Sequence, residues 1–100
     1  MSKLTTIFWR DIPAQVIGQQ GRERHKQELS KRFAVAIDRA AMRAGRGSSQ
    51  AYLDDWRRES RLSEGGLKQL VSAELARLEE QFPEELLEAV VKAGGIFHSD

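Results

Sequence analysis

The sequence predicts an α+β fold in which a short N-terminal β-hairpin packs against three or four α-helices. Residues 3–10 form a run of β-branched and aromatic side chains, which is typical of a strand. After this hairpin, apolar side chains recur every three or four residues, which is typical of helices packed on a core. One hundred residues, of which 40% are apolar, suffice for one modest core. We therefore expect a single small domain over residues 1–100, with a hairpin at 1–21, a helical part at 22–95 and a tail at 96–100.

The predicted hairpin consists of two short strands joined by a turn. Both faces of residues 3–10 carry large apolar groups, so we expect the strand to be covered on both sides or to be covered in part by a partner. Asp11-Ile12-Pro13 favours a turn, because proline holds the residue before it in an extended conformation. Residues 14–17 predict the second strand, and residues 18–21 predict a loop with glycine at each end. Because a two-stranded hairpin is marginal on its own, it must pack on the helices or be extended by a third strand or by another chain.

The strongest helical pattern begins at Arg22 and ends at Ala44, before Gly45 and Gly47. Its apolar stripe is formed by Leu29, Phe33, Ala36, Ile37, Ala40 and Ala44. This stripe needs an apolar cover, and the first strand can supply it. We therefore expect Trp9 and this stripe to share one core.

Three further helices are predicted. Ser48 or Ser49 would cap the second helix, which ends near Ser60. The third helix follows Gly65-Gly66, and its stripe is formed by Leu67, Leu70, Val71, Leu75, Leu78 and Phe82. The fourth begins with Pro83, a residue suited to the first helical position, and ends at Gly94-Gly95.

The charges are distributed unevenly along a chain whose net charge is only +1. Residues 22–61 carry eleven Lys and Arg against six Asp and Glu, whereas residues 62–100 carry three against eight. One interpretation is that the two parts face each other and neutralise each other inside the molecule. The other is that the basic part meets an acidic partner.

The sequence offers little for catalysis, metal or cofactor binding. There is no cysteine, and the two histidines, His25 and His98, lie far apart in the sequence. No phosphate-binding or nucleophile motif appears, so we expect no enzyme activity, no catalytic or metal-ligating residues and no cofactor. No apolar run reaches the ~18–20 residues of a membrane span and no signal peptide is evident, so we expect a cytoplasmic protein without a membrane partner.

Nucleic-acid binding is one alternative that the sequence leaves open. Gly18-Gln19-Gln20-Gly21 resembles the GXXG loop of KH domains, and a basic segment follows it. In the predicted first helix the basic residues are Arg22, Arg24, Lys26, Lys31, Arg32, Arg39 and Arg43. These residues spread around the helix and acidic residues interrupt them, so we expect only weak binding.

The segment from Trp9 to Gln15 combines an aromatic ring, a cation, an anion and a rigid proline. One interpretation is a structural corner, in which Trp9 packs on a helix, Asp11 caps the turn and Arg10 pairs with a helix carboxylate. The other is a docking site for a partner protein, because Trp and Arg are favoured anchors at interfaces. The predicted partner-binding residues are then Trp9, Arg10, Asp11, Pro13 and Gln15. The open edges of the hairpin could also pair with a second copy of the chain.

Three stretches of the chain resemble the small bacterial virulence factor domain family. They are Trp9-Arg10-Asp11-Ile12-Pro13-Ala14-Gln15-Val16, then Phe33 with Ala36-Ile37-Asp38 and Ala40-Ala41-Met42, and finally Ala51-Tyr52-Leu53 with Trp56-Arg57-Arg58. The resemblance covers residues 4–60. It implies a setting near corrinoid- and folate-linked methyl transfer in bacteria, and it assigns no catalytic residue.

We therefore expect a small cytoplasmic interaction protein that binds a protein partner, as an adaptor subunit of such a methyl-transfer system. The first alternative is a nucleic-acid-binding protein that uses the basic first helix. The second is an enzyme subunit that is active only with its partner.

Overall fold

The computed structural model describes residues 1–47 and 49–97, in which a four-stranded antiparallel sheet packs against helices. The strands are β1 (Ser2–Trp9), β2 (Ile12–Gln20), β3 (Glu23–Glu28) and β4 (Trp56–Ser63), in the sheet order β3-β2-β1-β4. The helices are α1 (Lys31–Arg43), α2 (Ser49–Asp54), α3 (Leu67–Gln81) and α4 (Glu84–Lys92). The predicted α+β class is confirmed, and β1 and β2 form the predicted hairpin.

Two predicted helical segments are strands, so the prediction of a helical part over residues 22–95 is wrong in these places. Residues 23–28 continue the sheet as β3 alongside β2, and α1 begins only at Lys31. Residues 56–63, expected in part to continue the second helix, pair along the whole of β1 as β4. In both cases a ladder to a neighbouring strand satisfies the backbone groups that a helix would have satisfied locally. Gly18 likewise lies within β2, not in a loop.

The chain end also differs from the predicted free tail, as far as the structure describes it. The backbone N–H of Phe97 donates to Asp11 Oδ2, and Gly95 is buried. Residues 98–100, which include His98, and the predicted cap Ser48 lie outside the described residues.

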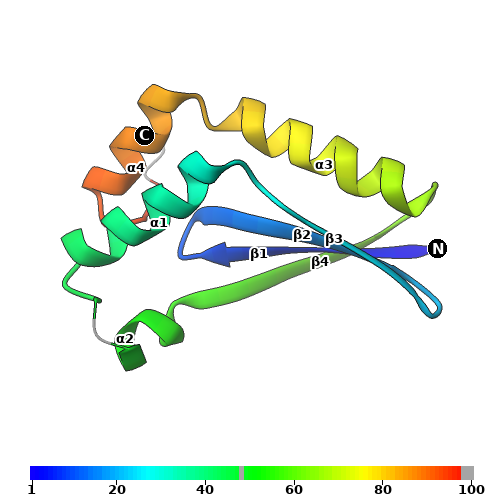
Figure 1. Ribbon diagram of the computed structural model, residues 1–100, viewed down its shortest axis with the longest axis horizontal. Coiled ribbons are helices and arrows are strands. Elements are labelled where there is room, and N and C mark those ends of the chain that lie inside the picture. The colour runs from blue at the N-terminus through cyan, green and yellow to red at the C-terminus, as the bar shows by residue number, and fades with distance from the viewer. Residues whose placement is uncertain (48, 98–100) are drawn as a thin grey trace.

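One face of the sheet is covered by α3, as Figure 1 shows. Gly18 marks the closest approach, because a Cβ atom there would lie 2.8 Å from Leu67 Cδ1 and 2.8 Å from Val71 Cγ2. α1 and α2 lie near the end of the sheet that carries the β1–β2 turn, whereas the β2–β3 turn lies at the opposite end (Figure 1).

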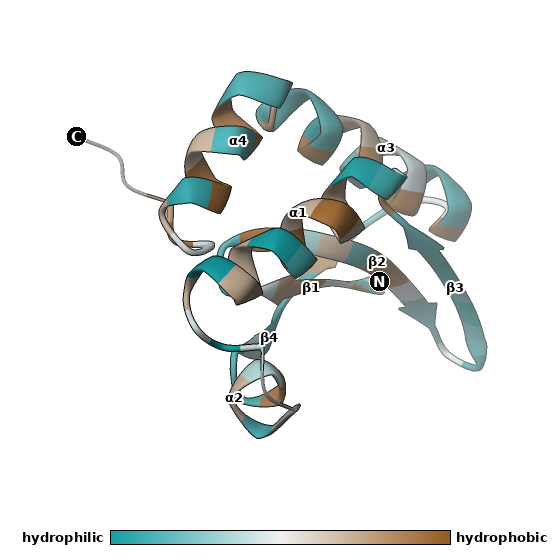
Figure 2. Cartoon of the chain, turned by 60° about the vertical axis from the view of Figure 1, so that its left-hand side comes forward, coloured by the Kyte–Doolittle hydropathy of each residue, from teal (hydrophilic) through white to brown (hydrophobic). Residues whose placement is uncertain are grey.

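The core lies between this covered face and the helices, whose apolar sides turn inward (Figure 2). Trp9 is 0% exposed and Phe33 is 1% exposed, and both belong to one cluster with residues of α3 and α4. The expectation that Trp9 and the stripe of the first helix share one core is therefore confirmed.

Candidate binding surface

The predicted docking residues surround the two-residue turn between β1 and β2. Trp9 and Pro13 are buried, so neither can touch a partner in this conformation. The indole Nε1 of Trp9 donates to the carbonyl of Tyr52 at 2.9 Å, and the two rings stack with centroids 5.8 Å apart. Through this hydrogen bond and this ring stacking, Trp9 connects α2 to the sheet.

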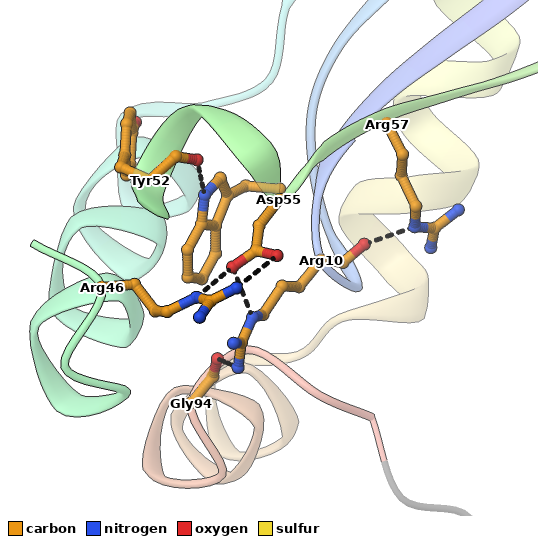
Figure 3. Close-up of polar contacts among 7 residues, drawn as sticks. Arg10, Arg46, Tyr52, Asp55, Arg57 and Gly94 are labelled. Carbon is orange, nitrogen blue, oxygen red and sulfur yellow. Dashed lines mark hydrogen bonds and ion pairs between the residues drawn. The ribbon is translucent and has the colours of Figure 1, made fainter. Parts of the chain in front are cut away.

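Arg10 occupies the first position of the turn and points back into the molecule (Figure 3). Its Nε donates to Asp55 Oδ2 at 3.1 Å, and its Nη1 donates to the carbonyl of Gly94 at 3.0 Å. Arg46 Nε reaches the same Asp55 oxygen at 2.8 Å. The hydrogen bond from Arg46, joined by that from Arg10, lowers the pKa of Asp55 although partial burial opposes this.

Asp11 is likewise engaged within the chain. Its carboxylate accepts from Arg57 Nη2 at 3.1 Å and from the backbone N–H of Phe97 at 2.6 Å. Arg57 Nε in turn donates to the carbonyl of Arg10 at 2.7 Å (Figure 3). These contacts support the interpretation of Trp9–Pro13 as a structural corner that joins the hairpin to β4 and to the chain end. The docking role of the corner remains a prediction, and Gln15 is the member that lies on the sheet surface beyond it.

Most of the hairpin's edges are occupied within the chain, which differs from the expected open edges. β1 is paired with β4 along its whole length, and β2 is paired with β3 from Gln15 to Gln20. Pairing between two copies of the chain stays a prediction. The free edges of the sheet belong to β3 and β4, both of which carry several charges. Charged edge strands resist pairing with other strands.

The sheet face turned away from α3 is the strongest candidate for a binding surface. Residues paired directly across an antiparallel ladder share a face, and the hydrogen bond between Thr5 Oγ1 and Ser60 Oγ, 2.8 Å long, agrees with this. We call this surface the open face; it comprises Lys3, Thr5, Ile7, Gln15, Ile17, Gln19, Arg24, Lys26, Glu28, Arg58, Ser60 and Leu62. Thr5, Ile7 and Ile17 are buried at its centre, and the charged side chains around them are exposed.

The open face is basic. Its cations are Lys3, Arg24, Lys26 and Arg58, and it carries one carboxylate, Glu28. In the part of the chain that the structure describes, none of these four cations forms an ion pair. Their charges are therefore available to an acidic partner.

A small cavity lies where the open face meets α1 and α2. We call it the end cavity; its volume is about 220 Å³, and it is lined by Ala14, Gln15, Glu28, Leu29, Ala34, Ile37, Tyr52 and Trp56. The rings of Tyr52 and Trp56 stand nearly perpendicular, at 88°, with centroids 5.7 Å apart. A second hollow, of about 300 Å³, shares Gln15 and Trp56 with it and continues onto the open face at Ile7 and Arg58.

The predicted basic first helix is wrong in its extent, because α1 begins only at Lys31, whereas nucleic-acid binding itself stays a prediction. Arg24 and Lys26 lie on β3, while Arg32 and Arg39 of α1 are paired with Glu79 and Glu88. The glycine pair of the supposed GXXG loop is also divided, because Gly18 lies within a strand and only Gly21 lies in the following turn.

Sequence reasoning missed Lys3 and Arg58 of the open face and the two aromatic residues of the end cavity. Residues 56–63 carry no alternating apolar pattern that could have revealed this strand or the face it completes.

Comparisons with known proteins add one result. The family model described as "Virulence factor" matches residues 7–91. No curated protein and no solved structure matches the chain. Within residues 1–47 and 49–97, no helix combines the length and the apolar character needed to cross a bilayer, and no three His, Cys, Asp or Glu side chains gather as metal ligands would.

Proposed function

The chain belongs to the virulence factor family, as its sequence resemblance predicted, and from this premise we propose that it is a small non-catalytic protein whose open face binds an acidic surface of a partner protein. The observation that carries the proposal is a group of four cations on one side of the sheet that form no ion pair with any residue the structure describes. Opposed charge on a partner would accelerate encounter and fix the orientation of the complex.

The arrangement of the remaining basic residues strengthens this argument. Arg32, Arg39 and Arg61 are held by carboxylates of α3 and α4, so internal pairing already consumes much of the basic charge in residues 22–61. The cations of the open face stand apart from this pairing among the described residues. A positive surface that the fold does not neutralise is suited to an external anion.

A partner protein fits the open face better than single-stranded nucleic acid does. Sheets that bind single strands present aromatic rings on which bases stack. The centre of this face instead holds Thr5, Ile7 and Ile17, which are 7%, 9% and 6% exposed. Because this centre is buried, the face presents mainly its exposed charged side chains, which suit a partner of opposite charge.

The setting of this function is the bacterial cytoplasm, where the family resemblance implies an adaptor subunit of a corrinoid- or folate-linked methyl-transfer system. The partner would then be a protein subunit of that system. The alternative of an enzyme subunit active only in complex uses the same surface, because it too requires a docked partner.

Affinity capture from native lysate of the source bacterium, with nuclease treatment, tests the proposal. The bait would be compared with the variant Lys26→Glu/Arg58→Glu, which reverses two exposed charges of the open face. We expect the unmodified protein to retain acidic protein partners after nuclease treatment and the variant to lose them. Near-neutral stability effects are expected at such exposed positions, and circular dichroism would check this.

The matched control is Lys68→Glu/Lys92→Glu, which makes the same charge change at exposed positions of α3 and α4. This control should capture the same partners as the unmodified protein. Equal capture by all three proteins would refute a role for the open face, and loss of all capture on nuclease treatment would point to nucleic acid instead.

A further inference from the structure

We propose that the end cavity binds a methylated ammonium cation. This site is separate from the charge of the open face and does not depend on the partner proposed above. The inference rests on the two aromatic rings, the carboxylate and the apolar lining of one cavity.

Two aromatic side chains of the kind that hold such cations line the cavity. Tyr52 and Trp56 stand at 88° to each other with centroids 5.7 Å apart, so a cation in the cavity would lie within reach of both ring systems. A cation held within about 6 Å of a ring centroid is attracted by the ring's quadrupole. Trp9 stacks on Tyr52 and does not line the cavity, so it holds the Tyr52 ring in place from outside.

The charges around the cavity also favour a cation. Glu28 lines it, and among the described residues this carboxylate takes part in no ion pair. Burial, aided by the nearby carboxylate of Asp38, raises the pKa of the Tyr52 phenol, so the phenol is neutral at physiological pH. Among the described residues, no Lys or Arg lines the cavity. Arg58 lines the adjoining hollow, which shares Gln15 and Trp56 with the cavity, and so it lies outside the cavity itself.

The rest of the lining selects a methylated cation over a primary ammonium. Ala14, Leu29, Ala34 and Ile37 offer methyl and methylene groups. A primary ammonium would lose its strong hydration against such a surface without gaining hydrogen bonds. A methylated ammonium is weakly hydrated and presents methyl groups that pack against it. A cavity of about 220 Å³ has room for one such head group.

The same head group could come from a free small molecule or from a methylated lysine of a protein. Two probes separate these sources: choline, and the acetylated amide of trimethyllysine. The control ligand is 3,3-dimethylbutan-1-ol, which has the shape of choline without its charge. Binding would be followed by the NMR shift of the Trp56 indole N–H, which reports on the cavity wall.

We expect saturable shifts of the Trp56 signal with choline or with the trimethyllysine amide, and the tighter of the two identifies the source. The uncharged isostere should produce no saturable shift at the same concentrations. Equal binding of the isostere would show a merely apolar hollow, and the absence of saturation with both cations would refute the site.

Variants give a second, independent measurement. Glu28→Gln keeps the size of an exposed side chain and should raise the Kd for the cation about three- to tenfold, the range expected for losing one favourable electrostatic contact. Glu23→Gln, on the same strand and opposite face, should leave the Kd unchanged. Trp56→Phe should retain binding while Trp56→Leu should abolish it. Because both variants lack the Trp56 indole, their binding would be followed by the indole N–H of Trp9, which donates to the carbonyl of Tyr52. An unchanged Kd in Glu28→Gln would overturn the proposal even if Trp56→Leu failed to fold.

Discussion

At the residue scale, Arg10 shows how a functional-looking motif can be structural. Its φ is +54°, in the left-handed region that residues with a side chain rarely adopt. A two-residue hairpin turn needs such a conformation, and glycine is the usual residue there. Here the contacts of the Arg10 side chain with Asp55 and Gly94 offset the strain. The contacts of the side chain therefore stabilise the strained turn and join it to two distant segments.

This balance gives a prediction for substitutions of Arg10. Arg10→Ala should be less stable than Arg10→Gly by about 1 kcal/mol, because both lose the contacts but only alanine keeps the left-handed strain. Urea unfolding followed by circular dichroism would measure the difference. If alanine proved as stable as glycine, the turn would have to relax to another conformation.

The same variants distinguish the two interpretations of the corner. If the corner is structural, as its internal contacts indicate, Arg10→Ala should lose stability while its folded fraction still captures the partner. If it is a docking site, Arg10→Ala should keep its melting temperature within a few degrees and lose capture.

At the element scale, the sequence allowed the elements with an apolar pattern to be predicted, but it did not allow the two charged strands, β3 and β4, to be predicted. β1, α1, α3 and α4 each place apolar side chains on a buried face, and a local pattern predicts them. β3 reads Glu-Arg-His-Lys-Gln-Glu and has no apolar residue on either face. Its stability comes from the ladder to β2, a partner that no local pattern shows.

β4 was missed for a related reason. Its charged side chains are held by tertiary contacts: Arg57 pairs with Asp11 and Arg61 pairs with Glu74. The preceding segment does form a helix, α2, which made a continuous helix the simpler interpretation. The open face was therefore out of reach of the sequence, since it exists only when β3 and β4 flank the hairpin.

The contact between α3 and β2 gives a prediction at this scale. Gly18→Ala should destabilise the protein by about 1–3 kcal/mol, because the new methyl group would overpack against Leu67 and Val71. Thermal and urea unfolding would measure it. Gly21→Ala, in the β2–β3 turn, is a useful contrast, since nothing lies within 4 Å of the added Cβ and only its positive φ is penalised.

A double-mutant cycle tests the cause. Leu67→Ala creates space beneath residue 18, so Gly18→Ala should cost clearly less in that background than alone. Additive losses would mean that Gly18→Ala acts through the strand backbone and not through the helix contact.

At the scale of the whole molecule, the uneven charge distribution supplies ion pairs inside the molecule and places further cations on the open face. Arg32–Glu79, Arg39–Glu88 and Arg61–Glu74 join the basic part of the chain to the acidic part, as one interpretation of the sequence expected. The hydrogen bond from Arg77, supported by Arg61, keeps the pKa of Glu74 below its ordinary value although burial opposes this. Glu74, Glu79 and Glu88 of the acidic helices are thereby paired internally, whereas the four cations of the open face form no ion pair among the described residues.

This distribution also predicts how the protein responds to nucleic acid. The four cations of the open face, which have no ion-pair partner within residues 1–47 and 49–97, can contact phosphates, so some binding is expected at low salt. If all four did so on duplex DNA, the logarithm of affinity would fall with the logarithm of salt concentration with a slope of about −3.6. Without aromatic rings at the centre of the face, nothing adds base stacking to this electrostatic attraction.

Gel-shift titrations should therefore give a Kd no tighter than about 1 µM at ~150 mM salt, within the ordinary non-specific range. The Lys26→Glu/Arg58→Glu variant should remove even this binding, whereas Lys68→Glu/Lys92→Glu should change it little. A sub-micromolar Kd that survives ~150 mM salt would make nucleic acid the partner of the open face and displace the acidic protein from that role.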